Sequence, residues 1–317
     1  MWQTLRALAD KRGDAAGMVS LLFWWATRTA TTAVAKSLHT FGGYRLSNEY
    51  DIQLYHRRAK AWPLVLGDPQ DELVRAGRRL LLGETVAIPE PGEIEIDFEA
   101  PDGGEALADE TRARFAVILD PAKHKLHDHS FEWHDWDMHR VPGKAKLLFP
   151  DWPAEFDGRD ADTASTRASL AVWQDVGYYH KNLREMAKSA AEYARQTERG
   201  AARSSRTAAR WRLAKIHADA YISEALSAKV LGVRLAGQPD LAYGPAAKVF
   251  STEAFIVDSA DLLDLTAPAS LTRGREGLGM IEIGYRHSTA TTIYGGTSEV
   301  LRSMIAERRL GLPRSRG

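Results

Sequence analysis

The stretch LLFWWATRTATTAVAKSLHTF, Leu21 to Phe41, decides the fold class. Its apolar residues recur three and four positions apart, and they do not alternate with polar residues as they would along a half-buried strand. A repeat of this kind places the apolar side chains on one face of a helix. Gly42 and Gly43 follow directly, and a glycine pair is typical of a helix end. The sequence therefore predicts a long amphipathic helix that stops at this pair.

The same helical pattern covers the whole N-terminal part, from about Trp2 to Leu82. A second helix is predicted from about Ser47 through EYDIQLYHRRAKAWPLVL, with an interruption at Pro63, because proline lacks a backbone donor. A third helix begins in GDPQDELVRAGRRLLL, where Asp-Pro supplies a capping residue and a first-turn proline.

An acidic linker is predicted over residues 83–107, which are rich in Pro, Gly and Glu and alternate only briefly, in EIEIDF. Beyond it, ALADETRARFAVIL predicts an amphipathic helix and LLFPDWPAEFDGRD a turn-rich loop. The rest is helical and Ala-rich, with breaks near Gly200, at GQPDLAYGP and at APASLTRGREGLG. Apart from residues 86–98, no alternating run is long enough for a strand, so we expect an all-α chain of helical bundles with little or no β structure.

Composition limits the partners that the chain can have. Lys plus Arg number 42 and Asp plus Glu number 42, and this neutral balance argues against a strong electrostatic nucleic-acid binder. Cysteine is absent, which excludes disulfides, thiolate metal sites and cysteine nucleophiles. The apolar run GMVSLLFWWA is too short to span a bilayer, and no signal-peptide layout precedes it. We therefore expect a cytoplasmic, soluble protein without nucleic-acid or membrane partners.

The stretch IYGGTSEV, residues 293–300, is the candidate binding loop. Gly295 and Gly296 permit a positive φ and a close backbone approach, Thr297 and Ser298 offer hydroxyls, and a helix begins directly after them. Such a loop can receive a phosphate or a flavin. The alternative is that Thr297 or Ser298 simply caps the helix, with the two glycines as the preceding turn.

The stretch TTIYGGTSEVLRSMIAERRLGLP is similar, nearly residue for residue, to the end of the C-terminal helical domain of the acyl-CoA dehydrogenases, which are FAD-dependent enzymes that desaturate acyl-CoA thioesters. GPAAKVFSTEAFIVDSADLLDL and YARQTERGAARSSRTAARWRLAKIHADAYISEAL resemble the first helices of that domain. LHTFGGYRLSNEYDIQLYHRRAKAWPLVLGDP also resembles the end of such an enzyme. This order looks like that of fused, double-length or heteromeric members that act on steroid or other bulky CoA thioesters.

The resemblance implies four parts. Residues 1–82 form the C-terminal end of one copy, 83–107 the acidic linker, 108–180 an N-terminal-like helical domain, and 181–317 a C-terminal helical domain. Between Tyr179 and Leu183 the family inserts a middle β-barrel domain, and here HKN joins the two helical parts directly. Asp157 stands at the first glycine of the family's usual Gly-Gly turn.

The resemblance also implies the cofactor and its ligands. Tyr294, Gly296, Thr297 and Glu299 belong to the FAD loop, with Thr297 and Glu299 in contact with the cofactor. In HTFGGYR, Gly42 and Gly43 supply backbone N–H groups to the FAD pyrophosphate of a neighbouring copy, although His39 and Arg45 replace the usual glutamine and third glycine. The first copy keeps Gly-Gly-Tyr and the second keeps YGGTSE, so two halves are expected to make one flavin site.

The chemistry needs a carboxylate that removes the α proton while the flavin accepts the β hydride. Gly295 stands where many relatives carry this glutamate, and in others the base follows the missing barrel, so the catalytic residue stays unknown. We expect an acyl-CoA dehydrogenase that acts on an acyl-CoA substrate, impaired or dependent on a partner, in a homo- or hetero-oligomer with acyl-CoA dehydrogenase-like subunits. The alternative is a catalytically inactive helical assembly subunit or a fragment.

Two further clusters have competing interpretations. HKLHDHSFEWHDWDMH combines five histidines with three aspartates, which suits zinc or iron, but its spacing matches no established metal motif and a solvated loop is favoured. The run RSSRTAARWRLAK could bind a CoA or FAD phosphate, but a solvated helix face is favoured. The family's flavin-contacting arginine aligns near Thr197, where this sequence departs.

Overall fold

The computed structural model describes residues 1–46, 49–90, 92, 103–118, 137–177, 179–196, 207–238, 240–272 and 277–314. Within these ranges the chain is all-α, as the sequence predicts, and no strand is present. None of the described helices is long and apolar enough to cross a bilayer. By their contacts the residues form two groups, the first of residues 1–98 with 191–218 and the second of residues 99–190 with 219–317. The four-part division expected from the sequence stays a prediction.

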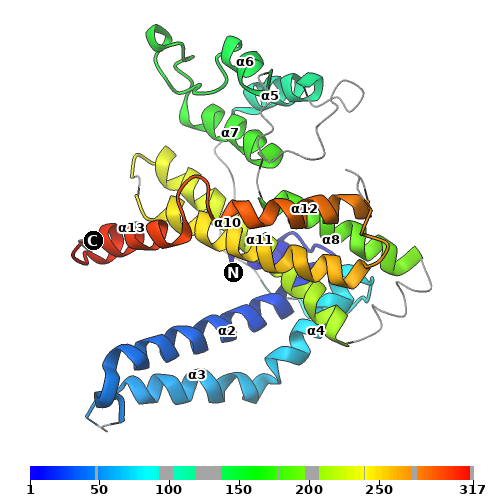
Figure 1. Ribbon diagram of the computed structural model, residues 1–317, viewed down its shortest axis with the longest axis vertical. Coiled ribbons are helices and arrows are strands. Elements are labelled where there is room, and N and C mark those ends of the chain that lie inside the picture. The colour runs from blue at the N-terminus through cyan, green and yellow to red at the C-terminus, as the bar shows by residue number, and fades with distance from the viewer. Residues whose placement is uncertain are drawn as a thin grey trace. The chain divides into compact units, whose positions relative to one another are not determined.

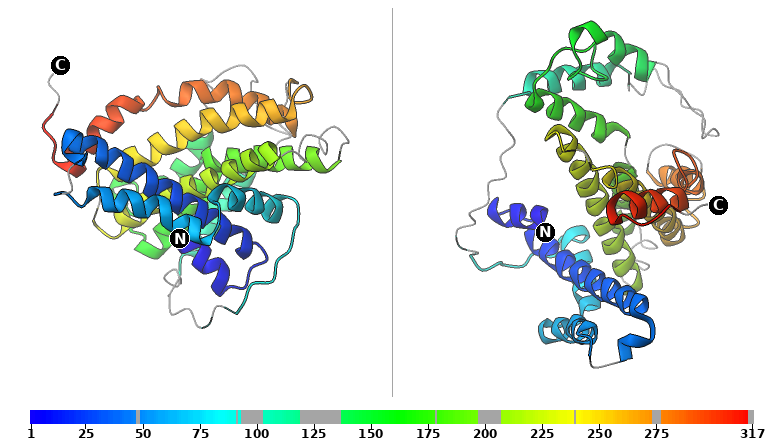
Figure 2. Two further views of the ribbon diagram at one scale, coloured as in Figure 1. Left: turned by 90° about the horizontal axis from the view of Figure 1, so that it is seen from below. Right: turned by 90° about the vertical axis from the view of Figure 1, so that its left-hand side faces the viewer.

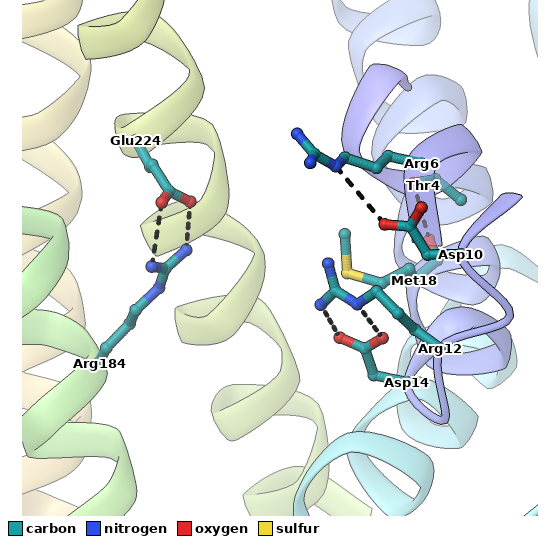
Figure 3. Close-up of polar contacts among 8 residues, drawn as sticks. All are labelled: Thr4, Arg6, Asp10, Arg12, Asp14, Met18, Arg184 and Glu224. Atoms are coloured by element: carbon teal, nitrogen blue, oxygen red, sulfur yellow. Dashed lines mark hydrogen bonds and ion pairs between the residues drawn. The ribbon is translucent and has the colours of Figure 1, made fainter. Parts of the chain in front are cut away.

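The first group is built around one long helix. It contains α1 (Trp2–Ala9), α2 (Ala15–Phe41), the 3-10 helix η1 (Gly42–Leu46), α3 (Ile52–Leu66) and α4 (Pro69–Leu81). As Figure 1 shows, α2 runs antiparallel to α3, while its N-terminal part packs on α4. Side chains from both helices form the core there, among them Leu21, Trp24, Leu73 and Ala76. The turn between α1 and α2 is tied by the paired contacts of Arg12 with Asp14 (Figure 3).

Local chemistry sets the helix ends of this group. Gly42 ends α2 with a φ of 58°, a conformation that glycine adopts without strain. Asp68 caps α4 by accepting a hydrogen bond of 2.8 Å from the backbone N–H of Gln70, and Pro69 occupies the first turn. Both of these predictions are confirmed. The predicted interruption at Pro63 is wrong: α3 begins at Ile52 and continues through Pro63 to Leu66, because a proline in the last turns removes only one bond of the helical ladder.

The second group opens with α5 (Glu105–Ile118), α6 (Asp137–Lys144), the 3-10 helix η2 (Ala154–Phe156) and α7 (Thr163–Gly177). Helix α5 packs on α7, where the rings of Phe115 and Trp173 meet edge to face at 4.6 Å. The LLFPDWPAEFDGRD loop consists of turns around η2, as predicted. Asp157 there has a φ of 61°, which explains why a glycine suits this position and why aspartate, which tolerates the left-handed region, replaces it.

The remaining helices are α8 (Tyr179–Gln196), α10 (Thr207–Leu235), α11 (Tyr243–Thr266), α12 (Leu278–Thr291) and α13 (Ser298–Leu310). Helix α11 packs on both α12 and α13, an arrangement visible in Figures 1 and 2. Helices α8 and α10 are joined by Arg184, whose guanidinium donates two hydrogen bonds to the carboxylate of Glu224 (Figure 3). The predicted breaks at GQPDLAYGP and APASLTRGREGLG fall at the ends of α10 and α11 and are confirmed.

Gly77 lies where α4 approaches α10 closely, and a Cβ there would stand 2.7 Å from the carbonyl oxygen of Arg210. We expect Gly77→Ala to lower the melting temperature, because backbone must shift, at a cost of about 1–3 kcal/mol. Gly232→Ala, in the last turn of α10 with nothing within 4 Å of the added Cβ, is the matched control and is expected to gain up to about 0.5–1 kcal/mol. Thermal unfolding followed by circular dichroism measures both. Equal melting temperatures for the two variants would contradict the close approach.

Candidate functional site

The loop between α12 and α13 is a glycine turn that leads into a capped helix. Gly295 and Gly296 have φ values of 66° and 98°, so both use the freedom that the sequence predicts for them. Thr297 is the N-cap of α13, and its hydroxyl oxygen accepts a hydrogen bond of 3.4 Å from the N–H of Val300. The capping interpretation of the loop is therefore confirmed. A helix cap and a cofactor contact can coexist, because the turn leaves Tyr294 and Gly295 exposed.

Lys248 of α11 holds this turn in place. Its ammonium group donates hydrogen bonds to the carbonyl oxygens of Tyr294 and Gly296, the latter at 2.6 Å, and lies 5.8 Å from the Tyr294 ring centroid. Charge-assisted bonds to two carbonyls are stronger than neutral ones, so they fix the peptide planes around Gly295. Burial lowers the pKa of Lys248. Lys248 is not among the residues that the sequence predicts for the site, although it is the single Lys or Arg of α11, and that isolation in a long helix is its sequence signal.

Tyr294 has a second contact, with a histidine one turn before the end of α12. The Nε2 atom of His287 and the phenol oxygen of Tyr294 are 3.1 Å apart. Burial lowers the pKa of His287, so its neutral imidazole is favoured. The ring centroid of Phe255, on α11, lies 6.4 Å from that of His287. Tyr294 is thus held at its backbone by Lys248 and at its hydroxyl by His287.

Glu299 lies in the first turn of α13 and is exposed. Its pKa is lowered by a hydrogen bond from its own backbone N–H and by a further one from the Thr297 hydroxyl. A carboxylate so stabilised in its charged form accepts a proton less readily than an unperturbed one, which weakens Glu299 as a catalytic base. Its charge also sits at the helix N-terminus, where an incoming phosphate would otherwise bind.

These observations test whether the loop fits a flavin dinucleotide. The exposed turn permits close approach of a flat group, and the Ser298 hydroxyl is buried without a hydrogen-bond partner among the described residues. The carboxylate of Glu299 repels phosphates but accepts hydrogen bonds from hydroxyl or amide groups. The loop therefore fits a neutral, hydrogen-bonding part of such a dinucleotide better than it fits a phosphate.

Gly42 and Gly43 lie at the end of α2 and the start of η1, in the first group of helices, whereas the other four predicted residues lie in the second. Both glycines are exposed, and a Cβ added at either meets nothing within 4 Å. Gly43 has no positive φ, so neither packing nor backbone conformation of the described chain requires a glycine there.

The other predicted clusters fall largely outside the described residues. Thr197, Arg203, Arg206 and the histidines at 124, 127, 129 and 134 are among these, while His139 belongs to α6. Among the residues that are described, no group of three His, Asp or Glu side chains could hold a metal ion. Arg210 and Arg212 belong to α10.

Burial lowers the pKa of His287 in the folded chain below the ordinary histidine pKa of about 6.5. The neutral side chain therefore contributes fully to stability at a pH above that ordinary pKa. This contribution is lost as the pH falls through the lowered pKa of the folded state. We expect the melting temperature of the wild type to fall between pH 7 and pH 5 more steeply than that of His287→Gln. His39→Gln, on the exposed surface of α2, serves as the control and keeps the wild-type slope. Equal slopes for all three proteins would show that His287 is not buried in neutral form.

Comparison with known proteins supports the similarity seen in the loop. Residues 170–310 match the family model described as "Acyl-CoA dehydrogenase, C-terminal domain", a range that runs from within α7 to the end of α13. No curated protein sequence matches the chain. A solved structure, the ChsE4–ChsE5 complex from Mycobacterium tuberculosis, aligns at 25% identity and a TM-score of 0.40 over 48% of this chain. The alignment spans 42% of the chain in that complex. The part that contains the candidate loop is thus similar to the C-terminal domain of acyl-CoA dehydrogenases.

Proposed function

We propose that this chain is part of an FAD-dependent acyl-CoA dehydrogenase and that it completes its catalytic site with a partner subunit. The observation that carries the proposal is the Lys248-held turn before α13, within the part that matches the acyl-CoA dehydrogenase domain. A turn fixed at two carbonyls and capped by Thr297 presents a defined backbone to a planar cofactor before that cofactor arrives.

In this proposal the two glycine turns divide the cofactor between them. Tyr294, Gly296, Thr297 and Glu299 hold a neutral part of FAD, in agreement with the charge of Glu299. Gly42 and Gly43 of a neighbouring copy offer backbone N–H groups to the pyrophosphate, and α2 and α3 contain no carboxylate that would repel it. Bound by these residues, FAD would supply an acceptor for the hydride that leaves the β carbon of the acyl-CoA thioester.

The base that removes the α proton comes from the partner in this proposal. Gly295 has no side chain, and the carboxylate of Glu299 is stabilised in its charged form at the helix terminus. The partner would also supply the β structure that the family places between the two helical parts, and it is an acyl-CoA dehydrogenase-like subunit or a second copy. By resemblance the substrate is a bulky acyl-CoA, as in steroid degradation. The cytoplasmic setting that the sequence analysis expects completes this proposal.

A second candidate function is a catalytically inactive helical assembly subunit. It is favoured by one specific observation, that Gly295 has no side chain and the Glu299 carboxylate is stabilised in its charged form. The two functions differ in one measurable property, since an assembly subunit that has lost the chemistry takes up no flavin.

The visible spectrum of the purified protein with added FAD, followed by anaerobic addition of an acyl-CoA, tests the proposal. We expect a flavin band that persists through gel filtration and that bleaches with acyl-CoA once a partner subunit with a catalytic carboxylate is present. A protein that stays colourless with FAD, both alone and with such a subunit, would establish the assembly function instead.

Gly43 allows a sharper test of the pyrophosphate half-site. Gly43→Val meets no steric obstacle in the fold, so its melting temperature should equal that of the wild type, whereas FAD affinity should fall at least about tenfold, because the side chain blocks a close approach to the backbone. Gly13→Val, also in open space, is the control and keeps full affinity. Unchanged FAD affinity in Gly43→Val would remove Gly42 and Gly43 from the site.

A further inference from the structure

Gly295 lies beside an ammonium group on an exposed part of the turn. Its φ of 66° is one that side chains other than those of Asn and Asp adopt only rarely. Its neighbours in the chain aside, a Cβ built on Gly295 would come within 4 Å of two described atoms, and both belong to Lys248: Cε at 3.7 Å and Nζ at 3.8 Å. The space in front of Gly295 is therefore bordered by a positive charge.

The Lys248 ammonium has one N–H that no described residue accepts. A lysine ammonium has three donors, and two of them donate to the carbonyl oxygens of Tyr294 and Gly296. The Tyr294 ring centroid lies at 5.8 Å, near the outer limit of a cation–π contact. In the described part of the chain no carboxylate forms an ion pair with Lys248. Its third donor and its unit charge are therefore available to a ligand.

Lys248 differs in this respect from Arg302, the cation in the second turn of α13. Arg302 pairs with Glu253 of α11 at 2.7 Å, and its charge also lowers the pKa of Glu299. The pKa of Lys248 is lowered by burial, with no contribution from a neighbouring charge. A cation that is partly desolvated and has no counter-charge is stabilised when an anion binds beside it.

From these observations we propose that the space in front of Gly295 is a binding site for a carboxylate, with the Lys248 ammonium as its cation. A carboxylate is planar and compact, and one of its oxygens accepts the third N–H of Lys248 in a charge-assisted hydrogen bond. A phosphate suits the site less well, because it carries nearly twice the charge on a turn that already bears the carboxylate of Glu299.

The carboxylate comes from a small free anion or from a side chain of the proposed partner subunit, and both present the same group to Lys248. Pairing with the ammonium lowers the pKa of the bound carboxylate, so it is charged at neutral pH and can accept a proton. Only its use as a base rests on the proposed function: the proton of the substrate's α carbon moves to a carboxylate oxygen while the hydride leaves the β carbon. Binding itself needs neither FAD nor substrate.

A double-mutant cycle at residue 295 tests the proposal in the full chain. Aspartate and asparagine both tolerate the φ of 66°, so the two variants differ chiefly in charge. At neutral pH and low salt we expect Gly295→Asp to melt about 2 °C above Gly295→Asn, because its carboxylate reaches the Lys248 ammonium. The difference should vanish when Lys248→Met is added. Molar salt should reduce it while Lys248 is present.

Gly237 provides the matched control, because its φ is also 66° and nothing lies within 4 Å of an added Cβ. The melting difference between Gly237→Asp and Gly237→Asn should not respond to Lys248→Met. The proposal is overturned if Gly295→Asp melts no higher than Gly295→Asn, or if their difference persists without Lys248. The salt comparison decides in the same way if Lys248→Met does not fold. These melts contain no FAD, so their failure is distinct from a failure of flavin uptake.

Sodium formate identifies the source of the carboxylate. In NMR spectra of the full chain, the Cε–Hε signal of Lys248, assigned by its loss in Lys248→Arg, should shift and saturate with a Kd on the order of 10–100 mM. The signal of Lys229, whose ammonium lies 5.5 Å from the Tyr243 ring centroid, is the control and should not shift. Saturation supports binding of free anions, and a positive cycle without saturation supports a side chain of the partner. Saturation by chloride at the same concentrations would overturn the preference for a carboxylate.

Discussion

The close approach of helices through small residues is the constraint on which this structure depends. Helices satisfy their own backbone hydrogen bonds, so only side-chain packing joins one to another. Gly77 brings α4 against the backbone of α10, and Gly284 leaves room for Met186 of α8, whose sulfur would be 2.6 Å from an added Cβ. Buried hydroxyls, such as those of Ser223 and Ser251, bond to each other across helices. A larger residue at Gly77 would displace α4 from α10, and one at Gly284 would press against Met186 from α12, the helix that precedes the candidate loop.

The candidate site follows from this packing. Because α11 lies against both α12 and α13, Lys248 of α11 reaches the turn that joins the other two and holds its carbonyls. The turn is therefore shaped by a neighbouring helix as well as by its own glycines. The turn carries the negative charge of Glu299, whereas the α2–α3 hairpin is basic. The proposed chemistry also needs a carboxylate base, a role that Gly295 cannot fill because it has no side chain.

The sequence predicted those features that are determined locally. The all-α fold, the end of α2 at Gly42, the cap at Asp68 and the cap at Thr297 each depend on residues within a few positions. Lys248 was not predicted in this way, because its contacts lie 46 and 48 positions away, and its isolation among the residues of α11 does not identify those partners. The prediction at Pro63 was wrong because it also considered only the local sequence. Helix α3 continues through Pro63 because its other backbone hydrogen bonds and its packing on α2 outweigh the one N–H donor that proline lacks.

The central claim is that the two glycine turns hold one flavin. Hydrogen–deuterium exchange of the full chain, with and without saturating FAD, tests it most directly, because backbone amides report where a ligand lies. The account predicts slower exchange in peptides that contain residues 42–46 and in those that contain residues 294–301, with little change in α5. Bound FAD that protects other segments and leaves both turns unchanged would contradict the account.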